Sequence, residues 1–177
     1  TLTVTDSNGM SSFYPVTIKV NPRIVITATV DTVTTTYGKV AYDTFTTTVG
    51  TGTGNITFTR TSSSGSSAIT NTSISGAPAT AVLTVGPTLP AGTYYETFTA
   101  TDSVGATTIK VIVIIVNPSI TLTGPKNNQI ETTSTKATSA SIAVAFGTGN
   151  RTALMSPNIS GITLTTTNIN SGTIVLN

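Results

Sequence analysis

The feature that most constrains this chain is a segment of 18 residues that occurs twice. Residues 5–22 (TDSNGMSSFYPVTIKVNP) and residues 101–118 (TDSVGATTIKVIVIIVNP) both begin with Thr-Asp-Ser-x-Gly and end with Val-Asn-Pro, 96 residues apart. Repetition at a long fixed period is typical of a chain built from similar modules. The 177 residues therefore have room for one complete module and parts of two others.

Each copy of the repeat predicts a β-hairpin. Asp6 and Asp102 stand where a carboxylate can accept backbone N–H groups of a turn, and a Gly follows each of them to permit positive φ. Proline cannot donate to a β-ladder, so Asn21-Pro22 and Asn117-Pro118 are expected to end both a strand and a module. The strand after each turn should bury alternate residues, namely Val16, Ile18 and Val20 in the first copy and Ile112, Ile114 and Val116 in the second.

Further matches extend the repeat along the chain. The sequence Gly-Thr-Gly-Asn occurs at residues 52–55 and again at residues 147–150. The predicted organisation is the last two strands of one module in residues 1–22, a complete module in residues 23–118, and the first part of a third in residues 119–177. Because both chain ends then fall in the same loop of a module, we expect either a window on a longer array or a subunit that exchanges strands with its neighbours.

The strand signals predict an all-β protein. Thr makes up about a quarter of the chain, and its branched Cβ suits a pleated sheet. Short runs alternate apolar and polar residues, as in Phe45 to Val49 and Ala81 to Val85, and turn signals separate them. Such runs indicate antiparallel β-sandwiches, and no convincing helix is predicted.

A resemblance to a known family follows from residues 73–118. The sequence SISGAPAT, at residues 73–80, and the sequence AGTYYETFTATDSVGAT, at residues 91–107, resemble the closing half of bacterial Ig-like repeats. In that family a Gly-Thr-Tyr strand leads into a Thr-Asp-x-x-Gly turn and a last strand. The resemblance implies tandem Ig-like sandwiches of the kind stacked in large prokaryotic surface proteins, adhesins and filaments. It implies a spacer, scaffold or adhesive role and no enzyme site.

Composition argues against several functions. His, Cys and Trp are absent, so no disulfide, no His or Cys metal site and no His- or Cys-based catalytic dyad can form. The eight Lys and Arg residues are scattered, and the formal charge is only +2, so nucleic acid is not an expected partner. No apolar run of the roughly 18 residues that a membrane helix needs occurs. We expect no cofactor, no metal and no catalytic residue.

One strand predicts a contact surface. Its outward positions in the middle module carry Val111, Val113 and Ile115, whereas the first copy carries Pro15, Thr17 and Lys19 there. An exposed stripe of β-branched residues favours lateral packing against another module or subunit. Two alternatives are that a loop of the same module covers the stripe, or that the strand is buried on both faces.

Other residues invite specific interpretations. Glu96 has the inward phase of its strand, so it requires either a Lys or Arg partner from the facing sheet or a β-bulge that turns it outward, and the bulge is favoured. Tyr94 or Tyr95 is expected to form a corner hydrogen bond. Asp6 and Asp102 are interpreted as turn residues rather than calcium ligands, because the chain holds only six acidic residues. Asn-x-Ser/Thr triplets make four residues candidate glycosylation sites: Asn55, Asn71, Asn150 and Asn158.

The sequence thus favours an extracellular or cell-surface structural protein that stacks Ig-like modules into a fibre, filament, sheath or surface layer. Its expected partners are copies of itself or neighbouring modules, and surface glycans are a further candidate. Three alternatives remain: a strand-exchanging pilus-type subunit, an adhesin stalk, and a carbohydrate-binding module of a secreted protein. A binding module would be expected to show a cluster of exposed aromatic side chains on one sheet.

Overall fold

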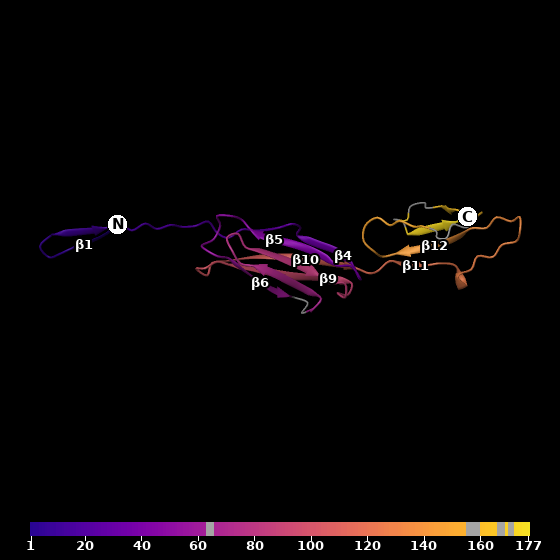
Figure 1. Cartoon of the computed structure of the whole chain (residues 1–177), viewed down its shortest axis with the longest axis horizontal. Helices are drawn as coiled ribbons and strands as arrows, with labels where there is room; N and C mark the ends of the chain where they lie inside the picture. Colours follow the sequence, from indigo (N-terminus) through magenta and orange to yellow (C-terminus); the bar gives the residue numbers. More distant parts are fainter. Residues whose placement is uncertain (63–65, 155–159, 166–168, 170–171) are drawn as a thin grey trace.

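A computed structural model describes residues 1–62, 66–154, 160–165, 169 and 172–177. The regular elements named below are β-strands, apart from a short 3₁₀ turn, η1 (Lys126–Asn128). Figure 1 shows three parts in a row along the long axis: an N-terminal hairpin, a β-sandwich and a C-terminal sheet. The all-β fold predicted from the alternating runs is confirmed.

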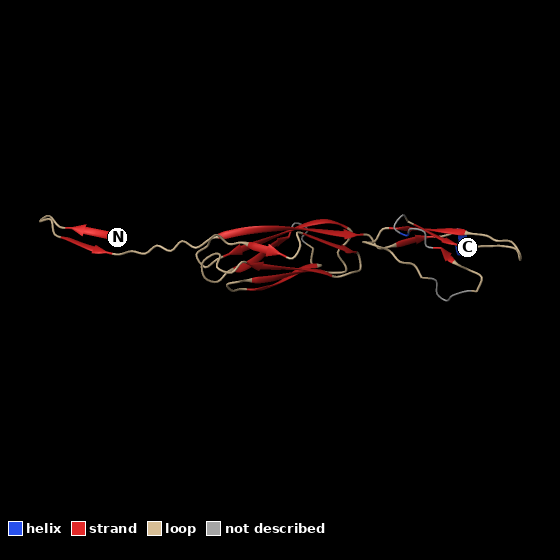
Figure 2. Cartoon of the chain, turned by 90° about the horizontal axis from the view of Figure 1, so that it is seen from above, coloured by secondary structure: helices blue, strands red, loops and turns tan. Residues whose placement is uncertain are grey.

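The central sandwich consists of two four-stranded sheets, which appear as two layers in Figure 2. One sheet has the order β3 (Ile26–Ala28), β5 (Ala41–Thr47), β8 (Thr80–Val85), β7 (Ile69–Ile74). The other has the order β4 (Thr32–Thr36), β10 (Thr107–Asn117), β9 (Gly92–Thr101), β6 (Thr57–Ser62). Neighbouring strands are antiparallel, except that β4 runs parallel to β10. This is the A-B-E-D and C-F-G arrangement of an Ig-like domain, with a short additional strand beside the last one.

Alternate residues of the long strands fill the space between the two sheets. Phe45 of β5 and Phe98 of β9 stack across this space, with ring centroids 4.2 Å apart and planes inclined by 29°. The inward row predicted for β10 is confirmed, since Ile112 and Ile114 are fully buried and Val116 is 3% exposed. Each fully buried Ile or Phe stabilises the fold by about 1.5–3 kcal/mol.

The N-terminal hairpin departs from its prediction. It pairs β1 (Leu2–Thr5) with β2 (Ser11–Tyr14), and the ladder ends where Leu2 faces Tyr14. The return strand was expected to continue to Asn21, with three side chains turned inward. Instead, all three are exposed: Val16 by 55%, Ile18 by 82% and Val20 by 86%. The alternation predicts that these three side chains share one face of a strand. Among the described residues, however, no strand pairs with this segment and no sheet faces it.

The C-terminal part repeats only one of the two sheets. Its strand order is β11 (Thr121–Thr123), β12 (Ala140–Ala145), β14 (Thr173–Leu176), β13 (Leu164–Thr165). This order matches β3-β5-β8-β7 of the sandwich. The described residues of this part form no second sheet. In the sandwich, by contrast, β4 pairs with β10 and β6 pairs with β9 to make the second sheet. A small core remains, made of Val144, Ile169 and Ile174.

Candidate inter-module joint

The Asn-Pro sequence at the start of the sandwich is held by a tight turn of the sandwich itself. The backbone N–H of Gly52 donates to the carbonyl oxygen of Pro22 over 2.8 Å. The side-chain Nδ2 of Asn21 donates to the hydroxyl of Thr53 over 3.0 Å. The linker before the module is therefore bonded to the Gly-Thr-Gly turn by one backbone and one side-chain hydrogen bond.

The same pair of hydrogen bonds recurs at the next Asn-Pro. The N–H of Gly147 donates to the carbonyl of Pro118 over 3.0 Å, and Nδ2 of Asn117 donates to the hydroxyl of Thr148 over 2.8 Å. We refer to each set of Asn, Pro, Gly and Thr residues as a joint: the first joint is Asn21, Pro22, Gly52 and Thr53, and the second is Asn117, Pro118, Gly147 and Thr148. Two linkers with the same bonds in the same positions indicate a built connection between modules.

Glycine is required in both joints because the turn is left-handed and crowded. Gly52 has φ +71° and Gly147 has φ +81°, a region that other residues rarely adopt. A Cβ on Gly52 would lie 2.9 Å from Cγ1 of Ile24, and one on Gly147 would lie 2.5 Å from Cγ1 of Ile120. Ile24 and Ile120 occupy the same place in the repeat, so the packing of the turn is repeated together with its hydrogen bonds.

The repeated hairpin turn completes the first joint. Oδ2 of Asp102 accepts the N–H of Thr53 over 2.9 Å. The backbone N–H and the hydroxyl of Ser103 both donate to the carbonyl of Thr53, over 3.1 and 2.6 Å. Thus Thr-Asp-Ser-x-Gly, Gly-Thr-Gly and Asn-Pro, which the sequence shows only as three separate recurring motifs, meet at one end of the sandwich.

The charge of Asp102 is stabilised where these motifs meet. Burial of this carboxylate favours its neutral form, but N–H groups from Ala106, Thr53, Val104 and Gly105 outweigh burial and lower its pKa below the ordinary value. Oδ1 accepts the backbone N–H groups of Val104 and Ala106, in its own hairpin turn, over 3.1 and 2.9 Å. Asp102 therefore bonds its own turn with one oxygen and the Gly-Thr-Gly turn with the other.

The second joint has further bonds to the sandwich that precedes it. The hydroxyl of Thr148 donates to the carbonyl of Thr35 over 3.2 Å. It lies 2.6 Å from the hydroxyl of Thr36, and since a hydroxyl has one hydrogen, Thr36 is the donor of that bond. Ser119 donates its hydroxyl to the carbonyl of Tyr37 over 3.2 Å. The end of β4 thus contacts both the linker and the following module.

The predicted turn residues have the expected roles. Oδ1 of Asp6 accepts the N–H groups of Asn8 and Met10, each over 2.9 Å, as Asp102 does in its own turn. The corner tyrosine is Tyr94, whose hydroxyl donates to the carbonyl of Pro90 over 2.9 Å. Within the described ranges, no cluster of three or more acidic side chains suitable for a metal is found.

The favoured interpretation of Glu96 is wrong. No bulge turns it outward: Glu96 lies in the regular ladder of β9 and is fully buried. Its Oε2 lies 2.8 Å from Nη1 of Arg60, and its Oε1 accepts the hydroxyl of Ser62 over 2.8 Å. Both partners come from β6, the neighbouring strand of the same sheet, rather than from the facing sheet.

A second buried acid, Asp43, was missed by sequence reasoning. It is 3% exposed in β5, and its inward phase between Ala41 and Phe45 was the available signal. Burial raises its pKa, although Oδ1 accepts the N–H of Val30 over 3.2 Å and of Thr44 over 2.9 Å. Its Oδ2 is buried with no hydrogen-bond partner among the described residues.

The proposed contact stripe lies on the outer face of the sheet that contains β10. Val111 is 46% exposed, while Val113 and Ile115 are half-buried. Beside them, β4 and β9 place Thr34, Tyr95 and Thr97 on the same face. The side chains are accessible, and lateral packing on them stays a prediction.

The candidate glycosylation sites are spread over the two larger parts of the molecule. Asn55 and Asn150 are exposed directly after the two Gly-Thr-Gly turns. Asn71 is half-buried in β7 and donates to the hydroxyl of Ser73 over 3.1 Å. Asn158 lies outside the described residues. Modification of these residues stays a prediction.

No family model and no curated protein matches the chain. Among solved structures, the BIgI domain of the beta protein from S. agalactiae, bound to CEACAM1, is similar over 55% of this chain and 99% of that chain, with a TM-score of 0.42 and 18% identity. The titin domains z1z2 in complex with telethonin are similar over 89% of this chain and 82% of that chain, with a TM-score of 0.40 and 11% identity. Over the described residues, no helix is long and apolar enough to cross a membrane.

Proposed function

We propose that the chain is an extracellular structural protein in which Ig-like modules are connected end to end into a fibre, sheath or surface layer. The observation that supports this most strongly is the repeated joint. The bonds from Gly52 to Pro22 and from Asn21 to Thr53 recur as those from Gly147 to Pro118 and from Asn117 to Thr148. A flexible tether between independent domains would have no need of matched bonds at each linker.

The proposed mechanism is mechanical. Tension would enter the sandwich at Pro22 and leave it through β10 at Pro118. Since β4 follows the entry point and runs parallel to β10 over five residue pairs, pulling the two ends apart shears this ladder. Hydrogen bonds in a sheared ladder are loaded together rather than one after another. The sandwich would therefore resist extension along the axis seen in Figure 1.

The proposal assigns the chain no catalytic role. Its partners would be neighbouring modules and copies of the same chain rather than nucleic acid. The surfaces of the sandwich are largely Thr-rich, with runs such as Thr57, Thr59 and Thr61 on one strand and Thr97, Thr99 and Thr101 on the next. Short hydroxyl-bearing side chains keep such a surface hydrated, and they do so without the positive charge that would attract polyanions.

Electron microscopy of material isolated from its native source with an antibody to the sandwich tests the proposal. The expected result is straight filaments or a regular layer on the outside of cells, with a spacing that corresponds to one module. Labelling confined to the cell interior, or discrete particles of a single chain, would contradict it.

A further inference from the structure

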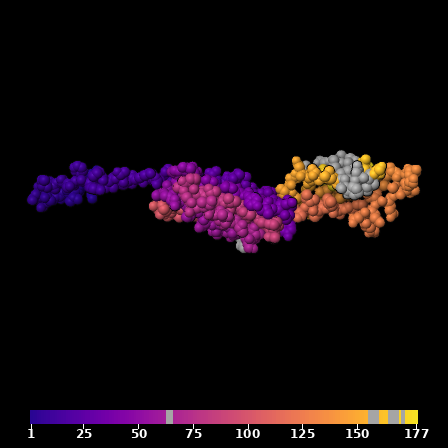
Figure 3. Space-filling model, in the orientation of Figure 1, coloured from indigo at the N-terminus to yellow at the C-terminus, as the bar shows by residue number. Residues whose placement is uncertain are grey.

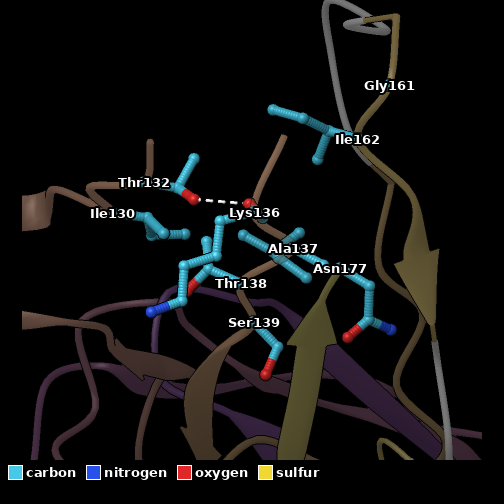
Figure 4. A pocket seen from close by; sticks show the side chains of 10 residues that line it. Ile130, Thr132, Lys136, Ala137, Thr138, Ser139, Gly161, Ile162 and Asn177 are labelled. Atoms are coloured by element: carbon cyan, nitrogen blue, oxygen red, sulfur yellow. Dashed lines mark hydrogen bonds between the residues drawn. The ribbon is translucent and has the colours of Figure 1, made fainter. Parts of the chain in front are cut away.

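The cavity of the C-terminal part offers no buried polar group to a ligand. It has a volume of about 550 Å³ and is shown in Figure 4. The polar side chains among the described residues that line it are all exposed, Lys136 included. The hydroxyl of Thr132 already donates to the carbonyl of Lys136 over 2.6 Å. A buried carboxylate oxygen without a partner lies instead in the sandwich, the middle body in Figure 3, and it belongs to Asp43.

The chain changes sheets between β3 and β4, at residues 29–31, which we call the crossing. β3 pairs with β5 in one sheet, and β4 pairs with β10 in the other. At the start of the crossing, the N–H of Thr29 donates to the carbonyl of Thr44 over 3.0 Å. At its end, the carbonyl of Asp31 accepts the N–H of Val113 over 3.1 Å. Backbone hydrogen bonds therefore attach each end of the crossing to one of the two sheets.

The middle of the crossing is bonded to the side chain of Asp43. Oδ1 of Asp43 accepts the N–H of Val30 over 3.2 Å and the N–H of Thr44 over 2.9 Å. Its Oδ2 is buried and has no partner among the described residues. A carboxylate with both donors on one oxygen is poorly compensated for the water that it loses on burial. The ionised form is therefore unfavourable while the crossing is in place.

The charged groups around Asp43 do not compensate it either. Burial raises the pKa of Asp43, and the negative charge of Asp31 in the crossing raises it further. Lys110, the only charged residue of β10, lies 2.6 Å from Asp31. On β9 of the facing sheet the inward acid is Glu96, which Arg60 neutralises. β3, β4, β8 and the rest of β5 have no charged residue.

We propose that Asp43 is a pH-sensitive latch that fastens the crossing to β5. With its proton, the side chain keeps Oδ1 as an acceptor for Val30 and has no charge for burial to penalise. Without its proton, the side chain is a buried charge that water would hydrate if the crossing opened. Val30 is 43% exposed and the side chain of Asp31 is 74% exposed, so the crossing lies at the surface, where local opening is possible.

The direction of the effect follows from the two states of the crossing. In the open state Asp43 has its ordinary value of 3.8, and in the closed state its pKa is higher. Below the ordinary value both states keep the proton, and the latch has its full strength. As the pH rises through the closed value, the closed state loses its advantage and the crossing opens more often.

The latch belongs to the sandwich alone and does not depend on the proposed function. If the modules bear tension between Pro22 and Pro118, however, the crossing lies in the loaded segment, because it connects β3 with the ladder of β4 and β10. A module would then resist extension better in mildly acidic surroundings than at neutral pH.

Hydrogen exchange of residues 1–177 between about pH 4 and about pH 7 tests the proposal. Protection of the Val30 amide, corrected for the intrinsic effect of pH on exchange, should fall as the pH rises. The Val144 amide, which is bonded to Gly172 in the C-terminal sheet, should keep its protection. Opening should become about tenfold more frequent for each pH unit by which the titration midpoint of Asp43 in the folded chain exceeds 3.8. NMR titration of the carboxyl group measures that midpoint, and constant protection of Val30 would overturn the proposal.

Two substitutions separate the latch from a purely structural role of Asp43. Asp43→Asn keeps an acceptor oxygen for Val30 but cannot ionise, so the protection of Val30 should no longer change with pH. Asp31→Asn removes the neighbouring charge from an exposed position, so the midpoint of Asp43 should move to lower pH. The matched control is Asp6→Asn, the same change in the N-terminal hairpin, which should leave the midpoint in place. A pH-dependent Val30 in Asp43→Asn, or equal midpoints in Asp31→Asn and Asp6→Asn, would overturn the proposal.

Discussion

Asp6 and Asp102 occupy the same place in the repeat and differ in what they bind. Both accept two backbone N–H groups of their own hairpin turn through Oδ1. Asp102 also accepts Thr53 through Oδ2. The pair therefore provides a natural comparison, in which the cost of the joint contact can be separated from the cost of the turn.

We predict that Asp102→Asn lowers the melting temperature of the sandwich. The loss of stability should be clearly larger than the loss that Asp6→Asn causes in the N-terminal hairpin. Asparagine has one acceptor oxygen, so it can keep the turn bonds but presents an N–H group toward the N–H of Thr53. Calorimetry of both variants measures the difference, and hydrogen exchange at Thr53 locates it. Equal effects of the two substitutions would show that the Thr53 bond adds nothing.

The ion pair of Glu96 predicts a strongly non-additive pair of substitutions. Arg60→Met leaves the fully buried Glu96 without its cation and should cost about 3 kcal/mol, as expected when one partner of a buried pair is removed. The double variant Arg60→Met with Glu96→Met should recover most of that loss. Urea denaturation of the wild type, both single variants and the double variant gives the coupling. Additive effects would contradict the account.

Asp43 and Asp102 should respond to pH in opposite directions. The pKa of Asp102 is lowered on folding, so its contribution to stability is present above the unfolded value and is lost as the pH falls through the folded one. The pKa of Asp43 is raised, so its charged form opposes folding as the pH rises past the unfolded value of 3.8. Relative to wild type, Asp43→Asn should therefore gain stability as the pH rises from about 3 to about 6, and Asp102→Asn should lose it. Denaturation curves over this range would contradict the assignment if the signs were reversed.

For single residues, the sequence predicts contacts with residues nearby in the chain better than contacts with residues far away in the chain. The turn bonds of Asp6 and the Tyr94 corner depend on residues at most four positions away, so their motifs contain the information. Glu96 was misjudged because Arg60, its partner, is 36 positions away. Only the register of β6 on β9 brings these two side chains together, and the phase of a single strand does not determine that register.

Among the elements, β10 and the chain after β2 have similar patterns and different structures. Ile112, Ile114 and Val116 are buried because the β3-β5-β8-β7 sheet faces them, whereas Val16 and Ile18 have no such neighbour in the described residues. The period of apolar residues predicts which face of a strand would be buried. It does not predict whether a facing layer is present.

The turns of the joints give a prediction at the scale of an element. Gly147→Ala should destabilise the C-terminal sheet more than Gly149→Ala does. Both residues have positive φ, at +81° and +72°, so both substitutions carry the left-handed strain of about 1–2 kcal/mol. Only at Gly147 does a Cβ meet a neighbour, 2.5 Å from Ile120, whereas nothing lies within 4 Å at Gly149. Thermal melts followed at the C-terminal sheet measure the difference, and equal losses would contradict the packing described.

At the scale of the whole molecule, the repeat in the sequence predicted modules but not how they are connected. Asn21 and Thr53 are 32 positions apart, and Asn117 and Thr148 are 31 apart. Their recurrence was visible, after 96 positions for the Asn and 95 for the Thr, yet nothing in a one-dimensional pattern shows that the two recurring motifs meet in space. One signal could have predicted the joints. It is the recurrence of polar residues, such as Asn21 and Asn117, that have no evident hydrogen-bonding role within their own module.

The central claim is that these joints hold successive modules in line. Spin labels on cysteines at Tyr42 and Leu122 would measure the distance between the sandwich and the C-terminal sheet, since both side chains are more than 60% exposed and the chain has no native cysteine. The predicted result is a narrow distance distribution that broadens when Thr148→Val removes the bonds to Asn117, Thr35 and Thr36. Thr107→Val, a substitution at an exposed residue away from the second joint, should leave the distance distribution narrow. A distribution that is broad in the unaltered joint, or unchanged by Thr148→Val, would contradict the claim.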